Sequence, residues 1–212
     1  MKKCSNISKT EKIGWKIIDD ISTIDEQLYT SYGKEKSYET VVEHIYECYL
    51  IGLLYLPAKS TELAYDKQKI LNMILIHDLG ECHTGDYPPF YDHIDEIKES
   101  ESIFNKGLFI NGVHNGIADL TDYLRLWKEW ENDSPDINVR IAKDLDKIHM
   151  IYKMLKLLNE TDLPLKKERI QKFLAERKTI KTEEGKKIFE MIIIKNKEYK
   201  ELINRYLSNI EE

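Results

Sequence analysis

Apolar residues recur at intervals of three and four along almost the whole chain, and strict alternation of apolar and polar residues is scarce. The first spacing is typical of amphipathic helices and the second of half-buried strands. Only nine glycines and five prolines interrupt the 212 residues, so few segments are broken into turns. The sequence therefore predicts an all-α protein, with a helical bundle as its architecture.

The individual helices follow from the extent of each apolar stripe. We expect helices over about 9–21, 39–56, 64–82, 96–109, 117–132 and 135–158, with two lysine-rich helices between about 165 and 210. Ser134 suits the N-cap of the sixth helix and Pro135 its first position. A chain of this length can bury a core without disulfides. We interpret it as one domain over 1–212, with a core at about 36–160 on which the terminal helices pack.

Charge and cysteine content exclude several classes of partner. The chain has 32 basic and 38 acidic residues, a net charge of −6, and no dense basic block. Neither a nucleic-acid polymer nor an anionic membrane is favoured as a partner. The three cysteines, Cys4, Cys48 and Cys82, form no paired motif, which indicates a reducing compartment. No apolar run approaches the length of a membrane span, and we expect a cytoplasmic protein.

Histidine and aspartate occur together where a metal could be held. His77 is followed by Asp78 within an apolar run, and His44 lies in an earlier apolar run. A neutral nitrogen ligand beside an anionic oxygen ligand suits a divalent transition metal. A third helix offers a carboxylate, and its periodicity does not separate Asp144 from Asp146. A single buried histidine is more often a core residue than a ligand, so the case depends on the convergence of three helices.

The predicted helix at 64–82 also presents a carboxylate. Ile70, Ile74, His77 and Glu81 follow at steps of four, three and four, so Glu81 shares the apolar face with the histidine. A carboxylate on a buried face needs a positive partner, which a metal supplies.

The other candidates have a weaker basis, because they follow no ligand spacing. We assign surface or supporting roles to four histidines, and we interpret Cys82 as a small core residue. These histidines are His83, His93, His114 and His149.

Four segments of the chain resemble the HD-domain phosphohydrolases, and within them the HD-domain 5′-deoxynucleotidases. Residues 39–44 look like the first-histidine motif, residues 77–86 are similar to HD-x-x-E-x-x-x-G-D, residues 126–131 resemble L-W-x-E-[YF]-E, and residues 143–147 look like the last-aspartate motif. The resemblance covers most of the chain. It implies one divalent ion (Mn, Co, Fe, Zn or Mg) held by four ligands, which are His44, His77, Asp78 and Asp146.

The same resemblance implies an activity. It indicates a metal-dependent phosphomonoesterase that hydrolyses (deoxy)nucleoside 5′-monophosphates to nucleoside and phosphate, with Glu81 as general acid or base. Asp86 would contact the sugar or orient the attacking water. Its partner is then a small phosphomonoester, in the first instance a nucleotide, and a homodimer is one assembly that the prediction allows.

The chain departs from this family at its phosphate-binding element. The family places R-x-G-W shortly before the first histidine, whereas this chain has Lys12-Ile13-Gly14-Trp15 followed by a longer insert before Glu39. Lys12 would then contact the phosphate as a point charge in place of a bidentate arginine, and Trp15 would pack on the sugar. Lys34, Lys36 or Arg140 could supply a further cation. Alternatives remain open: another phosphoester substrate (a cyclic nucleotide, a nucleoside triphosphate or a sugar phosphate), or a catalytically silent helical module that binds nucleotides.

Overall fold

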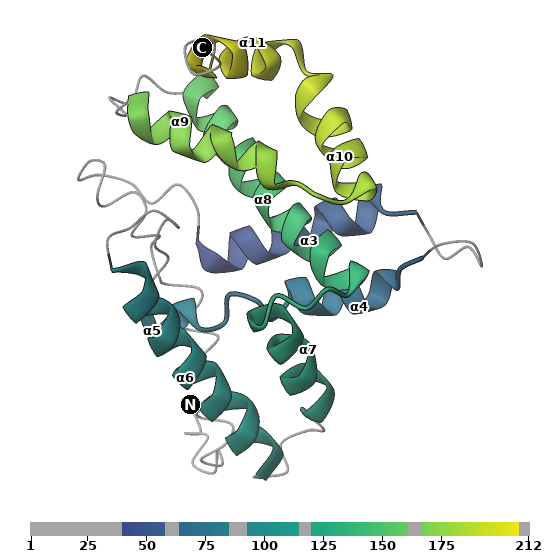
Figure 1. Ribbon diagram of the computed structural model, residues 1–212, viewed down its shortest axis with the longest axis vertical. Helices are drawn as coiled ribbons and strands as arrows, with labels where there is room; N and C mark the ends of the chain where they lie inside the picture. Colours follow the sequence, from purple (N-terminus) through teal and green to yellow (C-terminus); the bar gives the residue numbers. More distant parts are fainter. Residues whose placement is uncertain (1–39, 58–63, 85–92, 115–119, 161–166, 208–212) are drawn as a thin grey trace, which may run out of the picture. The chain divides into compact units, whose positions relative to one another are not determined.

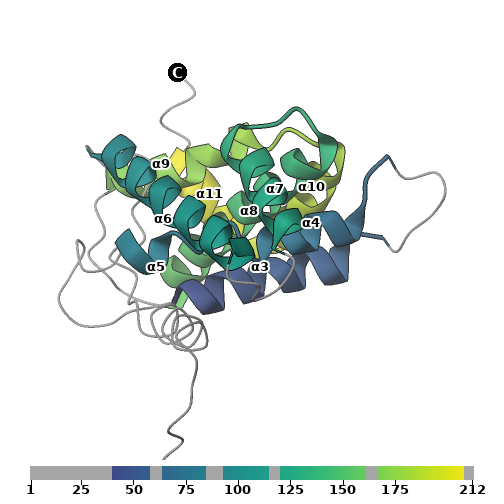
Figure 2. The same ribbon diagram turned by 90° about the horizontal axis from the view of Figure 1, so that it is seen from below.

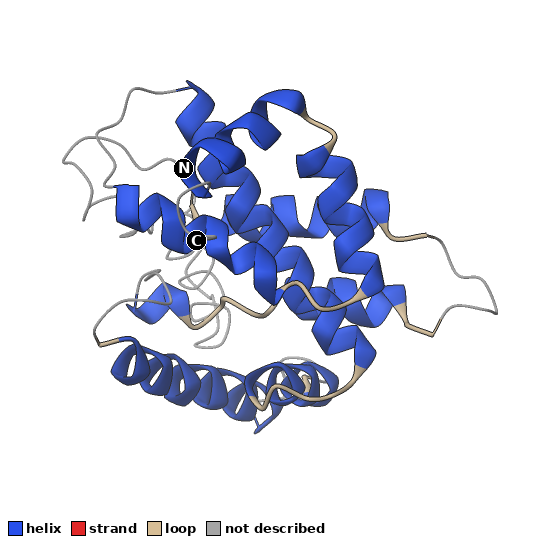
Figure 3. Cartoon of the chain, turned by 45° about the horizontal axis from the view of Figure 1, so that its top comes forward, coloured by secondary structure: helices blue, strands red, loops and turns tan. Residues whose placement is uncertain are grey.

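The computed structural model describes residues 40–57, 64–84, 93–114, 120–160 and 167–207. Within these ranges the regular secondary structure is helical and no strand is present, as Figure 3 shows. The predicted fold class, all-α, is confirmed. In the same ranges no helix is both long and apolar enough to cross a membrane. The predicted helix at 9–21 lies outside the described residues.

The helices have the following bounds in chain order: α3 Val41–Tyr55, α4 Lys67–Ile74, α5 Glu81–Thr84, α6 Ile94–His114, α7 Thr121–Glu131, α8 Ile137–Glu160, α9 Lys167–Ala175, α10 Glu183–Phe189 and α11 Lys197–Leu207. A 3₁₀ turn, η1 (Glu176–Thr179), follows α9, and a π-helical turn, η2 (Glu190–Ile194), follows α10. The described chain divides into two compact units.

The larger set of helices, which we call unit 2, comprises Tyr46–Ile74 and Asp133–Glu212. Its centre is α8, against which α4, α9, α10 and α11 pack (Figure 1 and Figure 2). The apolar stripe of α8 contributes fully buried side chains at steps of three and four, namely Ile141, Leu145, Ile148, Ile151 and Leu155. Burial of this stripe against four neighbours stabilises the unit.

The other part, unit 1, comprises Met1–Ile45 and Leu75–Asn132. Here α6 packs against both α5 and α7. Phe109 of α6 and Trp127 of α7 are almost fully buried, and their ring centroids lie 6.1 Å apart. The described part of unit 1 therefore has an aromatic contact at the centre of its α6–α7 pair.

The structure differs from the predicted helices in four places. The helix expected at 96–109 extends from Ile94 to His114. The helix expected at 64–82 ends at Ile74, and residues 75–80 form a turn before α5. Two helices were expected at the C-terminal end, and the structure has three, α9, α10 and α11. The backbone is extended at Ile180, and Thr182 then caps a new helix by accepting a hydrogen bond from Gly185 N. The helix expected from 135 begins at Ile137, where Asp136 accepts the Asn138 N–H at 2.8 Å and takes the capping place assigned to Ser134.

Candidate metal centre

The His77–Asp78 pair lies in a tight turn, not on a regular helix. Three backbone hydrogen bonds in and after this turn join residues three apart: Leu79 N to Ile76 O, Glu81 N to Asp78 O, and His83 N to Gly80 O. This spacing is that of a 3₁₀ turn, and such turns are common as connectors between helices. The predicted helical face shared by Ile74, His77 and Glu81 is therefore wrong in its geometry, although His77 and Asp78 are still placed together.

His44 is held in the first turn of α3 by the way that this helix begins. Thr40 N donates to Glu43 Oε2 at 2.7 Å, and Glu43 N donates to Thr40 Oγ1 at 3.2 Å. This reciprocal pair is a capping box, which fixes the start of a helix. The imidazole of His44 is therefore projected from an anchored helix end.

Three possible metal ligands lie close together in unit 1. His44 Nε2 lies 3.1 Å from Asp78 Oδ2, and His77 Nε2 lies 2.8 Å from the same oxygen. The ligand atoms of the three residues all lie within 4.8 Å of one another, and the two imidazole centroids are 5.5 Å apart. Two nitrogens and a carboxylate oxygen thus converge on one point.

The electrostatics of this cluster favour an ionised Asp78. Burial acts to raise the pKa of Asp78, but the charge interaction with His77 and the hydrogen bonds from His44 and His77 outweigh it, so that the pKa is lowered. The side chain of His77 is only 1% exposed, and its ring contacts Trp130, with centroids 4.8 Å apart. Aromatic packing on one side fixes the imidazole, whose Nε2 faces the carboxylate.

The donor set fits a divalent transition metal. Imidazole nitrogen and carboxylate oxygen together are the ligands that Zn, Fe, Co and Mn share in proteins, and an anionic Asp78 would offset the charge of the ion. His44, His77 and Asp78 are brought together as the sequence predicted, and this cluster could bind a metal.

The remaining predicted site residues have different positions. Glu81 begins α5 directly after the turn and is half-buried. Asp146 lies half-buried on α8 in unit 2. Lys12, Trp15 and Asp86 lie outside the described residues.

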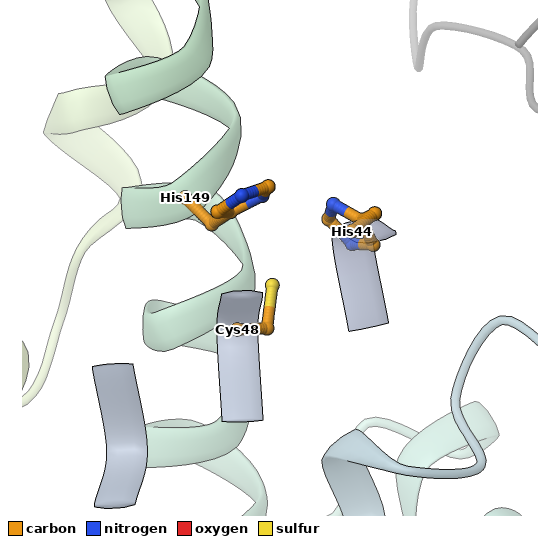
Figure 4. Close-up of side chains that lie close together, drawn as sticks. All are labelled: His44, Cys48 and His149. Carbon is orange, nitrogen blue, oxygen red and sulfur yellow. The ribbon is translucent and has the colours of Figure 1, made fainter. Parts of the chain in front are cut away.

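Sequence reasoning missed a polar cluster within unit 2. His149 of α8, which was given a surface or supporting role, is fully buried, and its Nε2 lies 2.9 Å from Glu47 Oε2. Lys153 Nζ donates to the other oxygen of Glu47 at 3.1 Å. Figure 4 shows His149 and Cys48, another fully buried residue, whose Sγ lies within 4.8 Å of an imidazole nitrogen of His149.

This cluster perturbs the acid chemistry of Glu47. The hydrogen bond with His149 lowers the pKa of Glu47, burial opposes it, and Lys153 lowers it further, to about 2. The only sequence signal is the i, i+4 pair His149 and Lys153 on one helix, and nothing in their spacing points to a carboxylate 102 positions away.

Comparison with known proteins agrees with the motifs. The HD-domain family profile matches residues 27–189, and the chain belongs to the HD-domain family. The expected family, that of the HD-domain phosphohydrolases, is thereby confirmed.

Among the proteins similar to the chain are the following two curated relatives and one solved structure. The 5′-deoxynucleotidase HDDC2 of Dictyostelium discoideum is 29% identical over 142 residues, which are 65% of this chain and 72% of that protein. The Xenopus laevis protein of the same name is 23% identical over 172 residues, 80% of this chain and 79% of that protein. A predicted metal-dependent phosphohydrolase from Magnetospirillum magnetotacticum MS-1 has a similar fold, with a TM-score of 0.61, 19% identity, and coverage of 96% of this chain and 97% of that chain.

Proposed function

We propose that this protein is a metal-dependent phosphomonoesterase that hydrolyses (deoxy)nucleoside 5′-monophosphates to nucleoside and phosphate. The observation that carries the proposal is the convergence of His44, His77 and Asp78 on one point in a chain of the HD-domain family. The similarity to two proteins named 5′-deoxynucleotidase supports the substrate class.

We assign Asp146 as the fourth ligand on the resemblance of residues 143–147 to the last-aspartate motif. Asp144 is 2% exposed, and its carboxylate accepts hydrogen bonds from Lys181 N and from both the N–H and the hydroxyl of Thr182. A carboxylate with its oxygens engaged in this way has a structural role.

The chain's own residues supply positioning and proton transfer. When bound, the metal would supply Lewis acidity toward a phosphoryl oxygen and toward the attacking water. Glu81 follows Asp78 by three residues, with its N–H bonded to the carbonyl of Asp78 at 3.0 Å, so its carboxylate starts from a backbone fixed beside the ligands. We assign it the transfer of a proton to or from the reacting oxygen, directly or through one water.

The activity itself is tested on the purified chain by measuring released phosphate and by separating substrate from products by chromatography, because opening a cyclic nucleotide releases no phosphate. Deoxynucleoside and ribonucleoside 5′-monophosphates, nucleoside triphosphates, cyclic nucleotides and sugar phosphates are compared, each with Mn, Co, Zn and Mg. We expect 5′-monophosphates to be hydrolysed fastest. Hydrolysis of triphosphates, cyclic nucleotides or sugar phosphates at a higher kcat/KM than that of any 5′-monophosphate would contradict the proposed substrate.

A substitution at Glu81 separates proton transfer from metal binding. We expect Glu81→Ala to retain its metal and to lose about 100-fold or more in kcat, which is the usual scale of general acid–base catalysis. Glu96→Ala is a matched control, because Glu96 is a carboxylate of unit 1 whose side chain is 81% exposed. Loss of metal from Glu81→Ala would make Glu81 a ligand, and turnover equal to that of Glu96→Ala would remove it from the mechanism.

A further inference from the structure

One face of α6 holds the segment that carries Glu81. Thr84 Oγ1 donates to Glu101 Oε1 at 3.0 Å, and the ring of His83 stacks on Phe104 with centroids 5.3 Å apart and planes only 6° from parallel. Glu101 and Phe104 lie three residues apart on α6 and therefore share a face. The last two residues of the four-residue helix α5 are thus attached to α6.

Gly80, at the N-terminal end of this segment, contacts the same face of α6. A Cβ placed on Gly80 would lie 2.8 Å from Asn105 Nδ2 and 2.8 Å from Glu101 Cβ. Distances this short leave no room for any side chain, so the backbone at Gly80 lies directly against the Asn105 amide. Asn105 follows Glu101 by one helical turn, so the face of α6 that contacts His83 and Thr84 also contacts Gly80.

The chemistry of Asn105 is unexpected for a packing residue. It is 2% exposed, and its buried Oδ1 has no hydrogen-bond partner among the residues that the structure describes. A buried amide oxygen without a protein partner carries a free-energy penalty that an apolar side chain of the same shape would avoid. Its presence beside the His77–Asp78 turn points to a role in the site, not in the core.

We propose that Asn105 is a positioning residue for Glu81. It acts by fixing the backbone at Gly80, the residue just before Glu81. This inference rests on the proposed role of Glu81 in proton transfer. The contacts of α6 reach residues 80, 83 and 84, on both sides of Glu81, so the carboxylate is presented from a segment fixed at both ends. Small displacements of a catalytic group cost large factors in rate, which is why such a support affects turnover.

A double-mutant cycle tests the proposal. The four proteins are the wild type, Asn105→Ala, Glu81→Ala and the double variant, and the readouts are kcat and KM on deoxyadenosine 5′-monophosphate with manganese, together with metal content. We expect Asn105→Ala, which removes the contact with Gly80, to lower kcat about tenfold or more in the wild-type background, with KM and metal content nearly unchanged. In the Glu81→Ala background it should change kcat less than about twofold, because the group that it positions is absent.

Two further variants keep the result interpretable. Ile103→Asn is the matched control, because Ile103 is on the same helix and 64% exposed, and its kcat should equal that of the wild type. If Asn105→Ala does not fold, Thr84→Val removes the hydrogen bond to Glu101 on the same face of α6, so it tests the same support of Glu81 and should give the same background-dependent loss.

Equal losses of kcat in both backgrounds, or no loss in the wild-type background, would overturn the role of Asn105. Wild-type turnover in Glu81→Ala alone would instead overturn the proposed role of Glu81, and with it the inference.

Discussion

Asp144→Ala should be among the most destabilising single substitutions in unit 2. The Asp144 carboxylate is buried and accepts from Lys181 N at 3.1 Å, Thr182 N at 2.8 Å and Thr182 Oγ1 at 2.6 Å. Removal of the carboxylate leaves three donors without their acceptor at the point where α10 begins. Each such bond to a charged group contributes about 1.5–3 kcal/mol, and the desolvation of the carboxylate offsets part of the sum. We expect a net loss of about 3–4 kcal/mol.

The assay is equilibrium urea unfolding followed by far-ultraviolet circular dichroism, with thermal unfolding alongside. For a chain of this size the expected loss corresponds to a fall in Tm of about 10 °C. Asp133→Asn is the control, because the Asp133 carboxylate also accepts a hydrogen bond, from Lys143 Nζ at 2.9 Å, but its side chain is 77% exposed. Asparagine tolerates the positive φ of 47° at this position. A change below about 1 kcal/mol in Asp144→Ala, or one equal to that of Asp133→Asn, would refute the reasoning.

Three other outcomes are expected. The folded pKa of Glu47 is about 2, below its ordinary value of 4.5, so its pairing with His149 stabilises the fold above about pH 4.5 and this contribution disappears as the pH falls toward 2. Because the Glu47 side chain is 37% exposed, Glu47→Gln should lower the free energy of unfolding by only about 1 kcal/mol at neutral pH and by nothing near pH 2. A pH-independent loss measured by urea unfolding would contradict this. Gly185→Ala should destabilise the fold by about 1–3 kcal/mol in the same assay, because its Cβ would lie 2.5 Å from Asp144 Oδ2, and an unchanged midpoint would contradict it. Deoxynucleotides should exceed ribonucleotides in kcat/KM by about ten- to a hundredfold. Trp15→Ala should lower this ratio by a larger factor than it lowers the rate on deoxynucleotides. Equal wild-type kcat/KM on both sugars would show that Trp15 does not discriminate between them.

Helical periodicity predicts which segments are helical but not where tight turns interrupt them. Ile70, Ile74, His77 and Glu81 follow at steps of three and four, which is the spacing of one face of an α-helix. The interruption at residues 75–80 depends on hydrogen bonds between residues three apart. These bonds leave no mark on the apolar pattern.

The candidate ligands His44, His77 and Asp78 could be predicted because they lie in apolar runs and the segments around them resemble the motifs of a known family. Glu47 and Asn105 could not, because each is a common polar residue whose importance comes from a partner distant in sequence. Glu47 meets His149 across 102 positions, and Asn105 meets the turn only because Gly80 lacks a side chain. Such contacts arise from packing, which local patterns do not encode.

The central claim, a metal-dependent phosphohydrolase site built on His44, His77 and Asp78, is tested most directly by measuring metal content and activity together. The wild type and His77→Gln are purified side by side, their metal is quantified by mass spectrometry, and phosphate release from deoxyadenosine 5′-monophosphate is followed before and after chelation. We predict that the wild type binds a divalent ion and loses activity on chelation, and that His77→Gln folds but has little metal and no measurable turnover. Full activity in the chelated wild type, or undiminished metal and turnover in His77→Gln, would contradict the account.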